Sequence, residues 1–122
     1  MTALLVLLGG AIGAPARYLT DLYVREWTGA DFPWGTMAVN AVGSLVLGLL
    51  AGAAASGVLP VWVLTLAGTG FCGALTTFST FSYETVRLAE SGRWRSAALN
   101  VLGSLAVGTA AVSLGWLVGS TI

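Results

Sequence analysis

The longest uncharged stretch of this chain, residues 32–83, is the feature that most limits its possible folds. It runs for 52 positions without an Asp, Glu, Lys or Arg. One membrane span needs about 20 apolar residues, because the hydrocarbon core of a bilayer is about 30 Å thick. The stretch is too long for one span and fits two, with a turn at residues 56–60. It therefore predicts that the chain crosses a membrane.

The composition extends this interpretation to the whole chain. Of its 122 residues, 57% are hydrophobic and 8% are charged, a balance typical of integral membrane proteins. We predict transmembrane helices at about residues 2–24, 33–55, 61–88 and 95–118. The expected fold is all-α, a single four-helix transmembrane domain over residues 1–122, multi-pass in the plasma membrane.

Few side chains are suited to catalysis. The chain has no histidine, a single cysteine (Cys72) and five carboxylates. The carboxylates fall near predicted span ends, and we expect Glu84 and Glu90 to face solvent at the end of the third span. The sequence therefore argues against an enzyme and against a thiol–histidine metal site.

The two halves of the chain repeat at an offset of 60 residues. The segment Trp34-x5-Asn40-x2-Gly43-Ser44-Leu45-x2-Gly48 recurs as Trp94-x5-Asn100-x2-Gly103-Ser104-Leu105-x2-Gly108. Because Trp, Asn and Ser all stay in register, chance is a poor explanation even in Gly-rich helices. We predict two helical hairpins in the same orientation, a parallel repeat.

The repeat also shows where the halves differ. Pro15 in the first span, and glycine followed by β-branched residues in the third, both disfavour an unbroken helix at the same depth. We therefore expect the third helix to be broken near Gly73–Thr77. Freed backbone groups at membrane depth are tolerated only when they are buried or line a cavity, so this segment is the expected functional one.

Small residues and charges indicate how the spans are arranged. Glycine pairs four residues apart permit close helix approach, and they occur at Gly9/Gly13, Gly48/Gly52 and Gly115/Gly119. All five basic residues lie in or beside the loops between spans 1 and 2 or spans 3 and 4, at Arg17, Arg25, Arg87, Arg93 and Arg95. By the positive-inside rule these loops face the cytoplasm and both termini face out.

Phe78 and Phe81 lie three residues apart, and Ser79, Thr80 and Ser82 surround them. Residues at this spacing share a helical face. The edge of an aromatic ring is electropositive and can face an anion without a formal charge. Hydroxyls and ring edges together suit a small anion that must shed water and still leave. Ordinary helix packing is the competing interpretation of the two rings.

Asn40 lies about two turns into the second span. It either makes a helix–helix hydrogen bond, the more frequent role of a membrane Asn, or offers N–H donors to an anion in a pore. Its repeat mate Asn100 favours the structural role, whereas Thr36, one turn earlier on the same face, favours the pore. Arg17 either snorkels to the membrane interface or acts at a pore entrance, where it attracts anions or serves as a structural partner.

Three motifs in order resemble the CrcB/Fluc family of fluoride channels, and the resemblance covers all four spans. They are Gly9-Gly10-x2-Gly13-Ala14-x2-Arg17-Tyr18, Gly35-Thr36-x2-Val39-Asn40-x2-Gly43-x4-Gly48, and Gly70-x2-Gly73-x2-Thr76-Thr77-Phe78-Ser79-Thr80-Phe81. The resemblance implies passive, fluoride-selective export that lowers cytoplasmic fluoride. It implies an antiparallel dual-topology dimer with two narrow pores.

The resemblance also implies site residues. Phe78 and Phe81 are expected to line each pore edge-on, with Asn40 as the pore amide and Ser104 on a hydroxyl track of the fourth span. Thr77 is expected to be a pore-side hydroxyl, like the neighbouring Ser79 and Thr80, and Arg17 a vestibule residue.

The family further implies a structural Na⁺ at the dimer interface, held by the backbone carbonyls of Gly73 and Thr76. The second subunit is another copy of this chain or an oppositely oriented homologue. Family members that insert both ways usually carry little Arg/Lys bias between their loops, whereas this chain has a strong one, so the homologue stays an alternative to the homodimer.

Two other functions compete with this one. A small proton-coupled multidrug exporter also has four spans and a dual-topology dimer, but it requires a membrane-embedded carboxylate in the first span. Residues 1–16 contain none, and Asp21 is the first carboxylate. A non-transporting assembly factor would explain the glycines and leave the hydroxyls of residues 76–82 unexplained.

Overall fold

The computed structural model describes residues 1–28 and 32–122, and four segments of them are helical, long and apolar enough to cross a membrane. Three are single α-helices: α1 (Thr2–Thr28), α2 (Trp34–Ala55) and α6 (Trp94–Thr121). The remaining segment consists of α3 (Val61–Val63), the π-helix η1 (Leu64–Cys72), α4 (Gly73–Leu75) and α5 (Ser79–Glu90). The described part of the chain is therefore all-α, and the protein is a multi-pass membrane protein.

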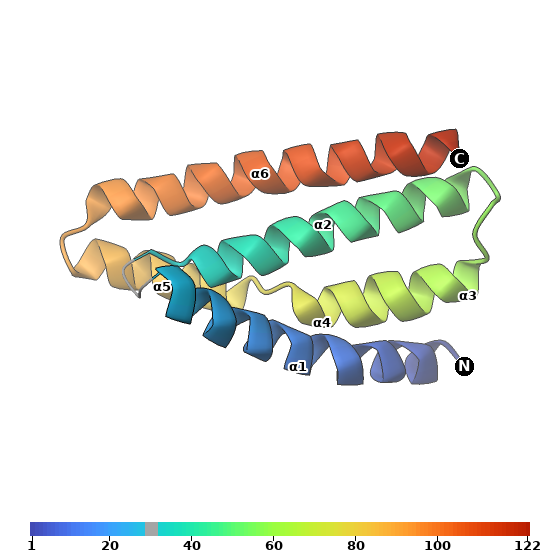
Figure 1. Ribbon diagram of the computed structural model, residues 1–122, viewed down its shortest axis with the longest axis horizontal. Coiled ribbons are helices and arrows are strands. Elements are labelled where there is room, and N and C mark those ends of the chain that lie inside the picture. The colour runs from blue at the N-terminus through green and yellow to red at the C-terminus, as the bar shows by residue number, and fades with distance from the viewer. Residues whose placement is uncertain (29–31) are drawn as a thin grey trace.

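The helices run along the long axis of the molecule, with both termini and the α2–α3 turn at one end (Figure 1). The α5–α6 connection lies at the opposite end. α2 packs most extensively against α6, and α1 against η1. These partners are the equivalent helices of the two halves, and each pair runs in the same direction. The predicted parallel repeat is therefore present in the structure.

Glycines let the equivalent helices approach backbone to backbone. A Cβ added at Gly52 would lie 2.8 Å from the Ser120 nitrogen, and one added at Gly119 would lie 2.9 Å from the Ala53 nitrogen. In the other pair of helices, a Cβ at Gly9 would lie 2.7 Å from the Phe71 nitrogen. Because real Cβ atoms do not approach other atoms this closely, these contacts require glycine. The predicted role of the glycine pairs in close packing is confirmed.

The expectation that Pro15 disfavours an unbroken first helix is wrong, because α1 continues through it from Thr2 to Thr28. A proline removes one backbone donor, and membrane helices tolerate this loss where neighbouring groups satisfy the freed carbonyl. The break occurs only in the third segment, as predicted, where α4 ends at Leu75 and α5 begins at Ser79.

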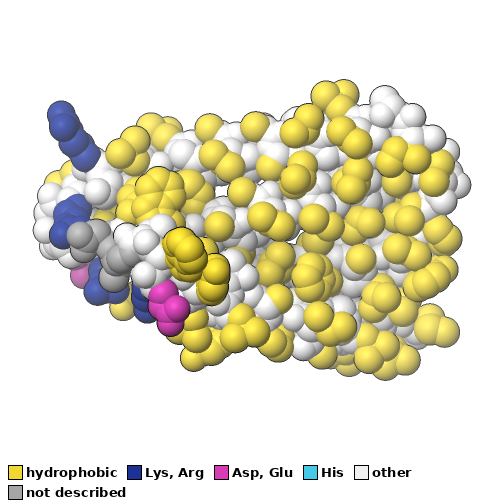
Figure 2. All heavy atoms as spheres, viewed as in Figure 1, with side chains coloured by type: hydrophobic (Ala, Val, Ile, Leu, Met, Phe, Trp, Pro, Cys, Tyr) yellow, Lys and Arg dark blue, Asp and Glu magenta, His cyan; other side chains and the backbone are white. Residues whose placement is uncertain are grey.

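Charged side chains gather at one end of the molecule, where α5 meets α6, and hydrophobic side chains cover the rest of the face that Figure 2 shows. At this end, Arg25 and Asp21 form a salt bridge of 3.1 Å. Both groups are partly exposed, so this pair contributes little to stability. The one-sided placement of the arginines is thus a feature of the fold as well as of the sequence.

Candidate functional site

The helix break is held by the side chain of Asn40, which reaches it from α2. Asn40 Oδ1 accepts a hydrogen bond from the Thr77 N–H at 2.8 Å, and Asn40 Nδ2 donates one to the Thr77 carbonyl at 3.0 Å. Thr76, just before it, has an extended backbone with φ −79° and ψ 157°. One amide therefore satisfies both backbone groups of the residue that leaves the helix, and the second N–H of Nδ2 stays available.

This arrangement frees two carbonyl groups from helical hydrogen bonding. In a continuous α-helix each N–H reaches the carbonyl four residues earlier, so the Thr77 N–H would bond to Gly73. It bonds to Asn40 instead. The Thr80 N–H, which would bond to Thr76, donates to Thr77 Oγ1 at 3.2 Å and so starts α5. The Gly73 carbonyl is thus left without a helical partner, and the Thr76 carbonyl accepts a hydrogen bond from outside the helix, from Arg17 Nη1 at 3.4 Å.

An open cavity of about 290 Å³ lies beside the break, between α2, α5 and α6. It brings together six of the predicted site residues, five expected in the pore and one, Thr76, expected at the cation. The lining residues are Asn40, Ser44, Thr76, Thr77, Phe78, Phe81, Ser104, Leu105 and Gly108. None of them is charged. The cavity thus combines an amide, hydroxyls and two aromatic rings.

The two phenylalanine rings are neighbours, with centroids 5.9 Å apart and planes inclined by 42°. Phe78 is 79% exposed within the single chain, whereas Phe81 is half-buried. Phe78 thus makes few contacts within its own chain and lies at the open side of the cavity. The pair follows from the three-residue spacing at the start of α5.

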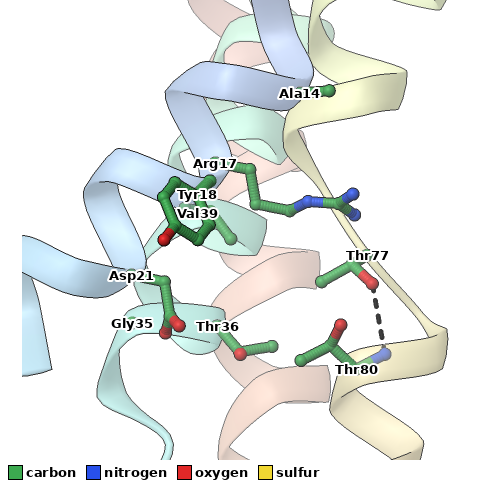
Figure 3. Close-up of a pocket in the computed structure, with 9 residues that line it drawn as sticks. All are labelled: Ala14, Arg17, Tyr18, Asp21, Gly35, Thr36, Val39, Thr77 and Thr80. Atoms are coloured by element: carbon green, nitrogen blue, oxygen red, sulfur yellow. Dashed lines mark hydrogen bonds between the residues drawn. The ribbon is translucent and has the colours of Figure 1, made fainter.

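A second cavity, of about 210 Å³, lies between α1, α2 and the break. Arg17, Thr36 and Thr80 contribute to its lining, and in Figure 3 the Arg17 side chain extends across from α1 toward the Thr77 segment. Arg17 Nη1 donates to the Thr76 carbonyl at 3.4 Å. Thr77 lines both cavities, so the break separates an uncharged cavity from one lined by the Arg17 guanidinium and the Asp21 carboxylate.

Two predicted residues lie elsewhere than expected. Ser79 lines neither of these cavities, although its Oγ lies 3.4 Å from Thr77 Oγ1. Glu84, expected to face solvent, is half-buried and accepts a hydrogen bond from Thr36 Oγ1. Where α5 lies beside α2, the two side chains meet, a contact between distant segments that residue spacing alone does not show.

Asn100 is a buried residue that holds α6 against α5. It is 1% exposed, and its Nδ2 donates to Thr85 Oγ1 at 2.8 Å, which ties α6 to α5. Thr85 in turn donates to the Phe81 carbonyl at 2.8 Å. Asn100 is therefore linked to the phenylalanine pair through one residue and does not line the open cavity.

Sequence reasoning did not single out Ser44 as a site residue, although it lines the open cavity. The available signal was the repeat, which places Asn40 and Ser44 at the same spacing as Asn100 and Ser104. Because Ser104 was expected at the site, its repeat mate was a candidate by symmetry.

Known proteins resemble this chain over nearly its whole length. Residues 4–116 match the family model described as CrcB-like protein, Camphor Resistance (CrcB). A protein named fluoride-specific ion channel FluC 1 from Frankia casuarinae is 54% identical, over 94% of this chain and 93% of its own length. One of the same name from Streptomyces avermitilis is also 54% identical, over 94% and 93%.

A third relative matches this chain over its full length. A protein named fluoride-specific ion channel FluC from Acidobacterium capsulatum is 46% identical, over 100% of this chain and 98% of its own length. The matches span all four membrane segments and the helix break. The chain therefore belongs to the CrcB-like protein family.

Proposed function

We propose that this chain is a fluoride-selective channel that lets F⁻ leave the cytoplasm passively across the plasma membrane. The observation that carries the proposal is the uncharged cavity beside the helix break, which holds Asn40, Phe78, Phe81 and several hydroxyls. The names of the relatives support fluoride as the ion. The proposal assigns no catalytic residue.

The chemistry of this cavity suits a small, strongly hydrated anion. Such an ion enters a pore only if many weak donors replace its water, and it leaves only if no single group binds it tightly. The free N–H of Asn40 and the positive edges of Phe78 and Phe81 are donors of this kind. A guanidinium in the same place would trap the ion, and in this structure Arg17 lies in the neighbouring cavity instead.

Arg17 supports the proposal as an entrance residue. A fixed positive charge beside the path raises the local anion concentration without occupying the path. Its guanidinium is held toward the break by the Thr76 carbonyl, at 3.4 Å. Thr36 and Thr80 line the same cavity, and so does Asp21, whose carboxylate is paired with Arg25 at 3.1 Å and therefore offsets the Arg17 charge only in part.

We propose a second subunit in antiparallel orientation, either another copy of this chain or an oppositely oriented homologue. The open side of the cavity and the 79% exposure of Phe78 support it. A narrow fluoride path requires walls on all sides, since an ion at an open cavity would meet lipid. The partner would close the cavity and complete the ring of donors.

Gly73 and Thr76 fit the proposed structural Na⁺. Hard cations take oxygen ligands, including backbone carbonyls, and the carbonyls of these two residues are freed from the helix by the bonds that Asn40 and Thr77 make. The Thr76 carbonyl also accepts from Arg17 Nη1 at 3.4 Å, so a bound cation would share this oxygen with the guanidinium or replace it there. A Cβ at Gly73 would meet nothing within 4 Å, so its surroundings are open to a partner. When bound, the ion supplies a fixed positive charge near the anion path.

The proton-coupled exporter finds no support. Asp21, the first carboxylate of α1, pairs with Arg25 at 3.1 Å near the end of the helix. A carboxylate already compensated by an arginine at the charged end of the molecule is poorly placed to carry protons across the bilayer. The relatives' names describe ion channels.

Growth of fluoride-sensitive bacteria tests the proposal in cells. A strain without its own fluoride exporter, expressing this chain, is expected to grow at fluoride concentrations that stop the same strain carrying an empty vector. Expression of Asn40→Asp at the same membrane level serves as the control and is expected to give no protection. Equal sensitivity of all three strains, both without and with a co-expressed, oppositely oriented homologue, would contradict the proposal.

A further inference from the structure

The open cavity carries four hydroxyl groups, from Ser44, Thr76, Thr77 and Ser104. An anion can use a hydroxyl only as a hydrogen-bond donor, so the position of each proton decides which of them is useful. Three of the four are already engaged within the protein.

Thr76 Oγ1 donates to the Cys72 carbonyl at 2.9 Å. Thr77 Oγ1 accepts the Thr80 N–H at 3.2 Å and lies 3.4 Å from Ser79 Oγ. The Thr76 proton is therefore committed to a carbonyl. The Thr77 oxygen holds the start of α5, and either Thr77 or Ser79 supplies the proton between their two hydroxyls.

Ser104 Oγ donates to Asn100 Oδ1 at 3.5 Å, a long bond. Asn100 is itself buried and anchored to Thr85, so the acceptor is fixed. With its proton on Asn100, Ser104 presents lone pairs to the cavity and would repel an anion until it rotates.

Ser44 differs from these three. Its Oγ has no hydrogen-bond partner among residues 1–28 and 32–122. Hydroxyls in helices often donate to the carbonyl four residues earlier, as Thr20 does to Ala16 at 2.8 Å, but Ser44 does not. A Cβ added at Gly108 of α6 would lie 3.9 Å from Ser44 Oγ, so this hydroxyl faces the space between α2 and α6.

We propose that Ser44 is a further ion-binding residue of the channel and donates its hydroxyl proton to fluoride in the open cavity. It lies one helical turn after Asn40 on α2, so the ion can pass from the Asn40 N–H to the Ser44 O–H along one helix face. The repeat mates Ser44 and Ser104 both line the cavity. The Ser44 hydroxyl proton is free for the ion, whereas the Ser104 hydroxyl proton is directed at Asn100 Oδ1. This inference rests on the proposed fluoride conduction.

Fluoride efflux from liposomes, measured against fluoride concentration, tests the assignment. Ser44→Ala is expected to lower the flux about tenfold and to raise the half-saturating fluoride concentration, since one donor to a charged ion is lost. Ser113→Ala removes an exposed hydroxyl of α6 that lines neither described cavity. It is the matched control and is expected to leave both quantities unchanged.

A rescue variant separates a donor from a packing residue. Gly108 has room for a side chain, because the only atom near its added Cβ is Ser44 Oγ, at 3.9 Å. Ser44→Ala combined with Gly108→Ser returns a hydroxyl to the same space from the opposite helix. The double variant is expected to recover most of the lost flux and the original half-saturating concentration.

Each outcome has a distinct meaning. Wild-type flux in Ser44→Ala overturns the role of Ser44 and leaves the channel intact. Absence of flux in the wild-type protein, both alone and reconstituted with an oppositely oriented homologue, overturns both proposals. If Ser44→Ala does not purify as a single species, Ser44→Cys, nearly the same shape with a weak S–H donor, replaces it. It is expected to show the same loss, and full flux through it contradicts the assignment.

Discussion

Asn40 and Thr77 are joined by two hydrogen bonds, of 2.8 Å from the Thr77 N–H to Oδ1 and of 3.0 Å from Nδ2 to the Thr77 carbonyl. A side-chain amide thereby takes the place of a neighbouring peptide group at the point where the third membrane segment leaves its helix. The same pairing frees the Gly73 carbonyl. The break, the open cavity and the proposed cation site thus depend on one residue of α2.

Replacing Asn40 tests that dependence. Asn40→Asp keeps an acceptor for the Thr77 N–H, loses the donor to the carbonyl and adds a negative charge to an anion path. We expect fluoride flux to fall more than about a hundredfold while the protein still purifies as a single species. Asn40→Ala loses both bonds and is expected to be less stable by about 2 kcal/mol. Flux in liposomes and thermal unfolding in detergent measure the two effects, and wild-type flux through folded Asn40→Asp would contradict the assignment.

Phe81 tests the role of the aromatic edges. Phe81→Ile keeps an apolar side chain of similar bulk and removes the positive ring edge, so fluoride flux is expected to be abolished without loss of folding. Phe71→Ile is the control, because Phe71 lies in η1 and lines neither of the two cavities described. Equal flux through both variants would show that Phe81 only packs.

Adjacent glycines of α1 test the helix packing. A Cβ at Gly9 would lie 2.7 Å from the Phe71 nitrogen, whereas one at Gly10 would be in ordinary contact with Ala74 Cβ, at 3.8 Å. Gly9→Ala is therefore expected to lower the free energy of unfolding by about 1–3 kcal/mol. Gly10→Ala is expected to be neutral. Thermal unfolding in detergent compares the two, and identical melting temperatures would contradict the close approach of α1 and η1.

Removal of Na⁺ tests the proposed cation. If the carbonyls of Gly73 and Thr76 hold it, protein kept in a buffer whose only cation is large and organic should melt at a lower temperature and carry less fluoride. Return of Na⁺ should restore both, because a ligand that binds only the folded state stabilises it. If the melting temperature and the fluoride flux stay the same with and without Na⁺, the proposed Na⁺ site is wrong.

Much of this architecture could be predicted because a bilayer leaves few choices. The length of the apolar stretches predicts the membrane spans, and the 60-residue repeat predicts two parallel helical hairpins. The spacing of the glycines predicts where the helices pack closely. The break was also predictable, since residues 73–77 combine glycine with β-branched side chains. The continuity of α1 through Pro15 was not predictable, because the helix tolerates the loss of one backbone donor.

Contacts between distant segments were harder to predict. The bond from Thr36 to Glu84 joins residues 48 positions apart, and that from Asn100 to Thr85 depends on how α5 meets α6. The availability of the Ser44 proton depends on which hydroxyls find partners inside the protein. A sequence shows where hydroxyls lie along a helix and does not show which protons remain unused.

Fluoride efflux from liposomes that contain only this chain is the most direct test of the central claim. A fluoride electrode reads the release, and a chloride electrode reads matched liposomes loaded with chloride. Liposomes that contain this chain are expected to release fluoride rapidly and to retain chloride. Retention of both ions, by this chain alone and by this chain reconstituted with an oppositely oriented homologue, would contradict it.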